Sequence, residues 1–402
     1  MTATESSARE RPAMRLLAGR SKRLRQGHPW VYSNEIDMDE AAKRLAPGML
    51  VRLVDAGGEA LGVASFNPHS LIAARLLSRD PDAAIDSGFL QARLARARDL
   101  RDALYDTPHY RLVHAEADGL PGLVVDRFAD VFVVQLNTAG MDRLGGEIVA
   151  ALQALFAPRA IVLRRDATVR TLEGIERAPP ETVGALDGPV ETLEAGVRFL
   201  VEPATGQKTG WYFDQRDNRD FAARLARGRS VLDAYCHTGA FAFRAAASGA
   251  ARVVGLDSSE PALALARQSA ALNGLEDRTS LEAADIFAAL AARAKAGERH
   301  GLVIADPPAF AKSRKDVNQG LRAYRKLARL AASLVEPEGF LVIASCSHHV
   351  ETTAFLAEVH AGLRDAGRNG RLLRIAGAGP DHPAHTALIE SSYLKCAALA
   401  LD

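Results

Sequence analysis

The stretch VLDAYCHTGAF, residues 231–241, decides the fold class of this chain. It starts as a short apolar run, passes Asp233, and enters a turn with Gly239 before an alanine-rich segment of helical composition. A strand that leads through such a turn into a helix forms the cradle for nucleotide-type ligands in α/β proteins, because glycine lets the backbone approach a ligand closely. The pyrophosphate fingerprint G-x-G-x-x-G is absent from this turn, which argues against a dinucleotide.

The same rhythm continues on both sides of this stretch. Strand-like runs are SVLDAY, ARVVGLD, TSLEAAD, GLVIADP and GFLVIAS, and Ala-rich helical stretches separate them. Strands that alternate with helices from residue 190 onward predict an α/β fold with a parallel, doubly wound sheet of the Rossmann-like type. Ligands of such sheets bind beyond the carboxyl ends of the strands, at the point where the strand order reverses.

Two further domains are predicted before this sheet. Residues 14–80 form a β-rich module, in which MLVRLVDAGGEALGVASF predicts a hairpin around residues 56–58. A small α+β domain follows over residues 88–178, with one helix expected over 141–156. The last domain then spans residues 190–402. Three domains suit a chain of 402 residues at about 100–200 residues per domain.

Composition narrows the class of protein. The chain is 48% hydrophobic and 25% charged with a formal net charge of +1, which excludes a disordered chain and a uniformly basic coat. A basic face on one part of the surface is still possible, because a net charge near zero can result from separate basic and acidic patches. The three cysteines are scattered and form no CxxC pair, so we expect neither a disulfide framework nor a metal site. No signal sequence or membrane span is apparent, which predicts a cytoplasmic protein.

Acidic residues follow three successive strands. Asp233 ends the first, Asp257 lies 18 residues after Gly239, and Asp285 follows the third. A carboxylate at the second position can accept hydrogen bonds from ribose hydroxyls, and Asp285 could receive an adenine amino group. Each Asp alone has another interpretation as a loop residue or helix cap. Aspartates at the ends of three successive strands together favour a ligand-binding site.

The segments DAYCHTGAF, GLDSS, AADIF and ADPPAF, in that order, resemble the S-adenosylmethionine-dependent methyltransferases with a Rossmann-like sheet. The resemblance covers residues 205–350. TGWYFDQRDNR, residues 209–219, is similar to the element that closes over the cofactor in ribosomal RNA methyltransferases; alternatively, Asp214 caps a helix there. The cofactor-binding residues that the resemblance implies are Phe213, Gln215, Arg216, Asp233, Tyr235, Thr238, Gly239, Asp257, Ser258, Asp285, Ile286 and Asp306.

The reacting centre is expected at the ends of the fourth and fifth strands. Asp306 is followed by two prolines that fix its backbone, and in the resembling enzymes this loop faces the target base. Cys346 ends the fifth strand in a Ser-Cys-Ser sequence. A thiolate that adds to carbon 6 of a pyrimidine makes carbon 5 nucleophilic toward a methyl group, and a base then removes the carbon-5 proton. The predicted catalytic residues are therefore Cys346 and Asp306.

A second chemistry stays open at this loop. Related cysteine-dependent cytosine methyltransferases carry another cysteine after the prolines, whereas this chain has Ala309 and Phe310. Phe310 could stack on a flipped base, which would suit methylation of the amino group of guanine or adenine and needs no cysteine. A small buried residue that closes a strand is the alternative interpretation of Cys346 itself.

RNA is the expected substrate. Residues 312–329 hold seven Lys/Arg and one Asp directly after the DPPAF loop, which suits a phosphate backbone, although a solvated helix face is the ordinary interpretation of such a run. GHPWVYSNEI, residues 27–36, and the strands after it resemble a PUA domain, a small RNA-binding module. The predicted substrate contacts are Pro307, Pro308, Phe310, Lys312, Arg314 and Lys315.

The order PUA domain, α+β domain, methyltransferase domain resembles one family, the ribosomal RNA large subunit methyltransferase I family. That resemblance implies 5-methylcytosine in 23S rRNA as the product and S-adenosylmethionine as the methyl donor, and it leaves both a monomer and a homodimer open. Two other classes compete: a non-catalytic RNA-binding protein with a decayed sheet, and a small-molecule methyltransferase. The intact acidic set argues against the first, and the PUA-like module against the second.

Overall fold

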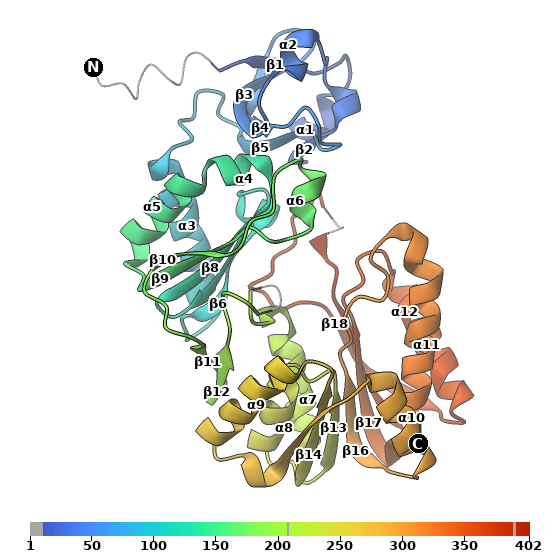
Figure 1. Ribbon diagram of the computed structural model, residues 1–402. Coiled ribbons are helices and arrows are strands. Elements are labelled where there is room, and N and C mark those ends of the chain that lie inside the picture. Colours follow the sequence, from blue (N-terminus) through green and yellow to red (C-terminus); the bar gives the residue numbers. More distant parts are fainter. Residues whose placement is uncertain (1–10, 207–208, 389–390) are drawn as a thin grey trace. The chain divides into compact units, whose positions relative to one another are not determined.

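The computed structural model describes residues 11–206, 209–388 and 391–402. The chain forms two compact units, and each combines segments that are distant in sequence. The first contains Met1–Gly188, Glu202–Trp211 and Pro380–Ile389, and the second contains Pro189–Val201, Tyr212–Gly379 and Glu390–Asp402. Figure 1 shows the elements of both units. No helix among the described residues is long and apolar enough to cross a membrane.

The N-terminal part of the first unit is a five-stranded sheet in the order β1-β3-β4-β5-β2. Its strands are β1 (Ala13–Arg15), β2 (Trp30–Val31), β3 (Met49–Val54), β4 (Ala60–Phe66) and β5 (Ala74–Ser78), accompanied by the short helices α1 (Lys22–Arg25) and α2 (Glu40–Lys43). The predicted hairpin is confirmed, because β3 and β4 pair antiparallel around the glycine turn. Asp55 holds that turn by accepting from the N–H groups of Gly57 and Glu59, both at 2.9 Å.

A second five-stranded sheet, in the order β10-β9-β8-β7-β6, follows in the same unit. Its strands are β6 (His109–His114), β7 (Leu123–Phe128), β8 (Val131–Leu136), β9 (Ala160–Arg164) and β10 (Glu181–Gly184). The helices α3 (Ser87–Asp102) and α5 (Gly145–Phe156) pack together on this sheet, and Leu90, Leu94, Ile148 and Leu152 are fully buried between them and the strands. The predicted α+β composition is confirmed.

The single helix expected over residues 141–156 is wrong. The structure has two helices there, α4 (Ala139–Arg143) and α5, and the backbone leaves helical geometry at Leu144. Thr138 caps α4 by accepting from the N–H of Met141 at 3.4 Å. Two consecutive glycines at the start of α5 weaken helix propagation, since glycine costs about 1 kcal/mol relative to alanine. The short helix α6 (Val169–Leu172) completes the unit.

The second unit holds a seven-stranded sheet in the order β15-β14-β13-β16-β17-β19-β18. Its strands are β13 (Ser230–Ala234), β14 (Arg252–Asp257), β15 (Thr279–Ala283), β16 (His300–Ala305), β17 (Val335–Ser345), β18 (Gly370–Ala376) and β19 (Lys395–Leu401). The first five strands in space pair parallel, and β19 is antiparallel to both of its neighbours. The order reverses between β13 and β16, which confirms the doubly wound sheet and places its switch point there.

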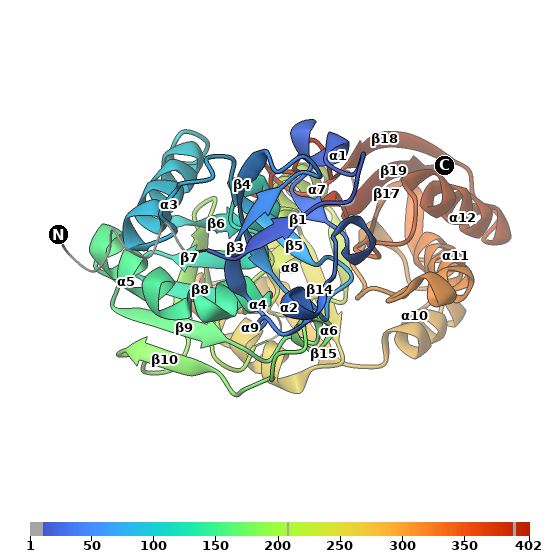
Figure 2. The same cartoon turned by 90° about the horizontal axis from the view of Figure 1, so that it is seen from above.

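Helices cover both faces of this sheet. Figures 1 and 2 show α7 (Arg216–Ala226), α8 (Ala240–Ala247) and α9 (Glu260–Leu272) on one face, with α10 (Ile286–Lys295), α11 (Val317–Ser333) and α12 (Thr352–Asp365) on the other. The central strand β16 is buried at every residue, as expected for a parallel strand with helices on both faces of its sheet. This rigid frame brings the carboxyl ends of five strands to one edge.

Two parts of the second unit depart from the expected βα rhythm. Residues 190–201 form an antiparallel hairpin of β11 (Val190–Glu194) and β12 (Val197–Val201), where a helix-containing repeat was expected to begin. The edge strand β18 was also not predicted. Its residues are mostly exposed, so they lack the continuous apolar pattern by which the buried strands are recognised.

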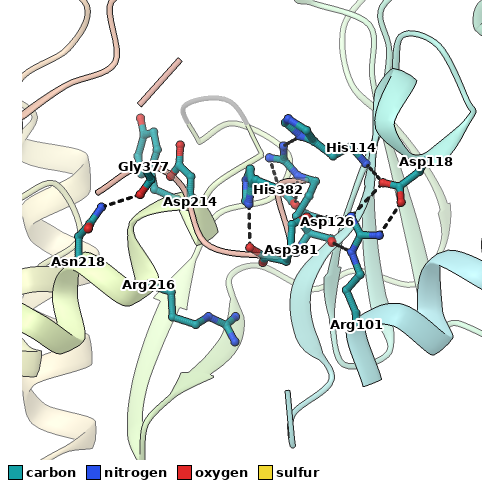
Figure 3. Close-up of polar contacts among 12 residues, drawn as sticks. Arg101, His114, Asp118, Asp126, Asp214, Arg216, Asn218, Gly377, Asp381 and His382 are labelled. Carbon is teal, nitrogen blue, oxygen red and sulfur yellow. Dashed lines mark hydrogen bonds and ion pairs between the residues drawn. The ribbon is translucent and has the colours of Figure 1, made fainter. Parts of the chain in front are cut away.

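Residues of the C-terminal segment Pro380–Ile389 belong to the first unit through a buried polar network (Figure 3). Arg101 is fully buried and donates to both carboxylate oxygens of Asp118 and, at 2.8 Å, to the carbonyl of Asp381. Asp381 in turn bonds the ring of His382 at 2.8 Å and accepts from the N–H of Arg111 at 3.0 Å. The connection between β18 and β19 therefore contributes these residues to the first unit.

Candidate active site

The turn after β13 carries backbone strain at the edge where ligands are expected. Tyr235 and His237 have positive φ angles of 68° and 51°, and Gly239 has a φ of 83°. A side chain on Gly239 would meet the Phe243 ring at 2.4 Å, so only glycine fits there. Non-glycine residues in this region cost of order 1–3 kcal/mol and cluster at functional sites. The loop is therefore held in its shape for a ligand.

Asp233 and Thr238 each place in this loop a polar atom that could hydrogen-bond to a ligand. Asp233 is completely buried, and one carboxylate oxygen accepts from the N–H of Ala242 at 2.9 Å. Its other oxygen, and the buried hydroxyl of Thr238, have no hydrogen-bond partner within the described ranges. Burial, followed by the nearby Asp306, raises the pKa of the Asp233 carboxyl well above its ordinary value. Such groups normally have a partner, so a ligand with donors and acceptors is expected here.

Asp257, at the end of β14, shapes the same loop. Its two oxygens accept from the N–H groups of His237 and Ser259, both at 2.8 Å, and each retains a lone pair for a ligand hydroxyl. Ser258 beside it is exposed. Asp285 is exposed and caps α10 by accepting from the N–H of Ala288 at 2.8 Å, while Ile286 is buried. Asp285 therefore has the capping role that the sequence left as its alternative interpretation, and its solvent side stays open to a ligand.

The segment from Tyr212 to Arg219 is held in place by one buried carboxylate, that of Glu194. Glu194, at the end of β11, is 4% exposed and pairs with the fully buried Arg219 through two bonds of 2.6 Å. Arg219 donates in turn to the carbonyl of Tyr212 at 2.9 Å. Arg216 approaches the same Glu194 at 3.9 Å. The hairpin that the sequence did not predict thus fixes this segment.

Phe213, Gln215 and Arg216 lie in the 3-10 turn and first turn of helix that this anchor holds. All three are buried, and the Arg216 guanidinium lies over the Phe213 ring at 5.4 Å. Gln215 accepts from Asn218 at 2.7 Å, and Asn218 also donates to the carbonyl of Gly377, as Figure 3 shows. The predicted closing element is thus held within the second unit by several buried contacts.

Asp214 does not cap a helix, so that interpretation is wrong. The residue at the N-cap of the 3-10 turn is Tyr212, and Gln215 precedes α7. The buried Asp214 carboxylate instead accepts from the Tyr393 hydroxyl at 2.5 Å, just before β19. This bond connects the segment to the far end of the chain, which no local sequence signal could predict.

Tyr212 is a site residue that was not among the predicted cofactor contacts. Its ring packs edge-on against His237 at 5.4 Å between centroids. Burial, with the nearby charges of Asp306, Asp214, Cys346 and Asp257, raises the pKa of the Tyr212 phenol well above its ordinary value. Tyr212 is therefore near residues from three strand ends. Its aromatic position inside TGWYFDQR was the signal that could have identified it.

The Asp306 loop lies beside the cofactor loop. Ala305 of β16 pairs with Ala234 of β13, and the Asp306 N–H donates to the Ala234 carbonyl at 3.3 Å. Asp306 is half-buried, Pro307 is buried and Pro308 is exposed. Predicted cofactor and substrate residues therefore meet at the switch point.

Cys346 lies next to this loop. Its thiol is partly exposed and lies 3.8 Å from the Pro307 carbonyl. The other two cysteines, Cys236 and Cys396, are buried, and burial raises the pKa of both thiols. Cys346 alone combines access with a position at the strand ends.

Phe310 packs into an aromatic cluster. Its ring centroid is 4.8 Å from that of Tyr324 and 5.9 Å from that of Phe287. Ser347 supports this arrangement, because its hydroxyl bonds the Tyr324 hydroxyl at 2.8 Å and accepts from the Ala311 N–H at 3.1 Å. Phe310 is thus packed on at least two sides.

The basic segment after the loop is largely solvent-exposed. Lys312, Arg314 and Lys315 are exposed where the chain enters α11. Further along the helix, Arg325 pairs with Asp365 at 2.7 Å and Lys326 lies over the Phe287 ring at 4.8 Å. The end nearest the site therefore offers the cations that are most accessible to a phosphate backbone. No group of His, Cys, Asp or Glu in the described part of the chain is arranged to hold a metal ion.

The fold and the strand-end residues define an S-adenosylmethionine-dependent methyltransferase. The chain matches the family described by that name over residues 165–371, and a PUA-like domain over residues 14–79. The cofactor is S-adenosylmethionine. Its methionine part carries an ammonium and a carboxylate, which match the available Asp233 oxygen and Thr238 hydroxyl, and its ribose hydroxyls match Asp257.

More specifically, the chain belongs to the ribosomal RNA large subunit methyltransferase I family. It is 36% identical over 381 residues to the member from Pseudoalteromonas atlantica, which covers 94% of this chain and 96% of that protein. It is 37% identical over 391 residues to the member from Shewanella amazonensis, covering 95% and 97%.

Solved structures show the same fold. A structure described as an S-adenosylmethionine-dependent methyltransferase from Streptococcus mutans aligns with a TM-score of 0.80 at 19% identity, over 97% of this chain and all of that one. A methyltransferase structure in complex with S-adenosylhomocysteine aligns with a TM-score of 0.81 at 20% identity and the same coverage. The chain therefore shares its fold with these proteins.

The anchor under the closing segment leads to a first prediction. Replacing Glu194 by Ala leaves Arg219 buried without its carboxylate, which should destabilise the second unit by about 3–5 kcal/mol and weaken cofactor binding. Thermal unfolding and titration calorimetry with S-adenosylmethionine measure both effects. Glu191→Ala on the same hairpin is the matched control, because its pair with Arg198 is exposed to solvent and contributes little to stability. Equal effects of the two variants would contradict the anchor.

Proposed function

We propose that this protein methylates carbon 5 of a cytosine in 23S rRNA, with Cys346 as the covalent nucleophile. The position of Cys346 carries the proposal: a partly exposed thiol lies 3.8 Å from the Pro307 carbonyl, beside Asp306 and next to the cofactor loop. A thiol there can reach a base that enters between the two loops. The curated relatives support the substrate, because they are named ribosomal RNA large subunit methyltransferases.

Each site residue would have its own role in the reaction. S-adenosylmethionine supplies the electrophilic methyl group. The Cys346 thiolate adds to carbon 6 of the cytosine, which gives carbon 5 the electron density to take the methyl group. A base then removes the proton from carbon 5, and the thiolate leaves as the ring double bond reforms. Asp306 orients the cytosine by hydrogen bonding to its Watson–Crick edge, with Pro307 and Pro308 fixing the loop.

The packing of Phe310 favours this chemistry over amino-group methylation. Stacking on a flipped base needs an open ring face, and the Phe310 ring already packs against Tyr324 and Phe287. The amino-group alternative would also leave the accessible Cys346 without a role. We therefore assign Phe310 to the support of the loop.

RNA binding would come from the PUA module and from the cations beside the active site. We take residues 14–80 as the PUA module, residues 88–178 as the central α+β domain, and residues 190–402 as the methyltransferase domain. The exposed cations Lys312, Arg314 and Lys315 are placed to contact phosphates near the target base. A cytoplasmic location follows from a ribosomal RNA substrate.

Nucleoside mass spectrometry of 23S rRNA tests the assignment. Cells without this gene should lack one 5-methylcytidine, and complementation with the intact gene should restore it. Loss of a methylated guanosine or adenosine instead would keep the fold and cofactor but overturn the role of Cys346. No change in any rRNA nucleoside would overturn the substrate.

A further inference from the structure

A buried lysine lies across the strand ladder from the proposed nucleophile. Lys395 begins β19 and is 6% exposed. The antiparallel register of β17 and β19 pairs it with Ser345, the residue directly before Cys346. A lysine is rarely buried without a reason, because removing its charge from water is costly.

The ammonium of Lys395 holds the loop that carries the cysteine. It donates to the carbonyl of Ser347 and to that of Val350, both at 2.7 Å. These two bonds close the turn after β17 around Cys346. An ammonium has three N–H donors, and the third has no partner within the described ranges.

An electrostatic interaction connects the two groups. Burial lowers the pKa of Lys395, and the charges of Cys346 and Glu351 act in the opposite direction. The interaction is mutual, so a protonated Lys395 favours the thiolate of Cys346 as that thiolate favours the ammonium. A thiol beside a fixed cation has a lower pKa and a larger reactive fraction.

We propose that Lys395 is the positioning residue that activates Cys346, holding its loop and supplying the positive charge that favours the thiolate. This inference rests on the proposed role of Cys346. Nothing in the sequence pattern YLKCAALAL suggests it, because the lysine meets the cysteine only through the sheet.

Other titratable groups lie near Cys346 and Lys395. They are Tyr212 in the closing segment, Asp306 after β16, Tyr324 on α11, His348 and His349 in the loop of Cys346, and Glu351 directly before α12. The tyrosines and Asp306 add no positive charge. Lys395, by contrast, is a cation with a direct electrostatic interaction with Cys346.

The test is the pH profile of Cys346 alkylation by iodoacetamide in the full-length protein, without RNA. Buried Cys236 and Cys396 react slowly, and a Cys346→Ala sample gives their background. In the unmodified protein the midpoint should lie below about 8.5, the ordinary value for cysteine. Lys395→Met should raise it by about one unit, so that alkylation at pH 7.5 becomes roughly tenfold slower. Lys395→Arg should keep the lower midpoint, because it keeps the charge.

Matched controls separate charge from structure. Lys295→Met removes an exposed lysine of α10 and should leave the profile unchanged. Calorimetry with S-adenosylmethionine verifies that each variant retains its cofactor site. Equal profiles for the Lys395→Met and intact proteins, or equal shifts for Met and Arg, would overturn the proposal. If Lys395→Met does not fold, a midpoint at or above about 8.5 in the intact protein overturns it instead.

The failure of this inference can be distinguished from the failure of the proposed function. A lowered midpoint that depends on Lys395, together with a Cys346→Ala protein that still methylates RNA, would refute the nucleophile and keep the charge pair. An inactive Cys346→Ala protein with a midpoint independent of Lys395 would keep the nucleophile and refute this inference.

Discussion

Cys346→Ala should abolish methyl transfer to 23S rRNA while S-adenosylmethionine still binds. The substitution removes the atom that would bond carbon 6, and no other accessible thiol is near the site in the described part of the chain. Loss of a covalent nucleophile costs at least about four orders of magnitude in rate. Transfer of a labelled methyl group to unmodified 23S rRNA measures the activity, and calorimetry measures cofactor binding.

Cys396→Ala is the control for this variant. It makes the same chemical change at a fully packed position of β19, so its effect should be limited to about 1 kcal/mol of stability. Activity of Cys396→Ala should remain within about threefold of the intact protein. A Cys346→Ala protein that retains substantial activity would refute covalent catalysis and return the chemistry to Asp306 and an amino-group target.

Asp233→Asn should weaken S-adenosylmethionine binding more than any other single change at the strand ends. The new side chain has the same shape and can keep the bond to the Ala242 N–H, but it lacks the charge that we expect to pair with the cofactor ammonium. Losing one partner of a buried charge pair costs about 2–5 kcal/mol, or roughly 30- to 4000-fold in Kd. Calorimetry of Asp233→Asn against the exposed-surface control Asp277→Asn measures it, and equal Kd values would contradict the assignment.

The raised pKa of Asp233 adds a pH signature to this prediction. Burial and the neighbouring Asp306 favour the protonated carboxyl in the free protein. Binding of an ammonium requires the carboxylate, so the cofactor should release a proton on binding and its affinity should fall as the pH is lowered through that pKa. Calorimetry in buffers of different ionisation enthalpy measures the proton. Asp233→Asn should show no such release.

The parallel sheet and its loops could be predicted because they depend on local sequence. Buried parallel strands have the pattern of short apolar runs, and their order along the chain is enough to place Asp233, Asp257 and Asp306 at one edge of the sheet. The turn after the first strand could also be predicted, because Gly239 marks it within the same short stretch of sequence. The structure confirms the strands and adds the strain at Tyr235 and His237.

The residues that support the site could not be predicted, because they act across the fold. Glu194 lies on a hairpin whose alternating pattern gives no sign of its buried partner Arg219. Asp214 has the local sequence context of a helix cap, whereas its partner Tyr393 lies 179 positions further along. Lys395 reaches the Cys346 loop only through the antiparallel pairing of β19 with β17. Contacts between residues that are distant in the chain produce no periodic pattern in the sequence from which they could be predicted.

The central claim is the bond between Cys346 and a cytosine, and a mechanism-based trap tests it most directly. A 23S rRNA fragment with 5-fluorocytidine at the target position has no carbon-5 proton to lose after methyl transfer, so the Cys346 adduct cannot resolve. Denaturing mass spectrometry with S-adenosylmethionine present should show protein covalently joined to one RNA, with the link on the peptide that contains Cys346 and absent from Cys346→Ala. Methylated fluorocytidine released without any adduct, or an adduct that survives in Cys346→Ala, would contradict the account.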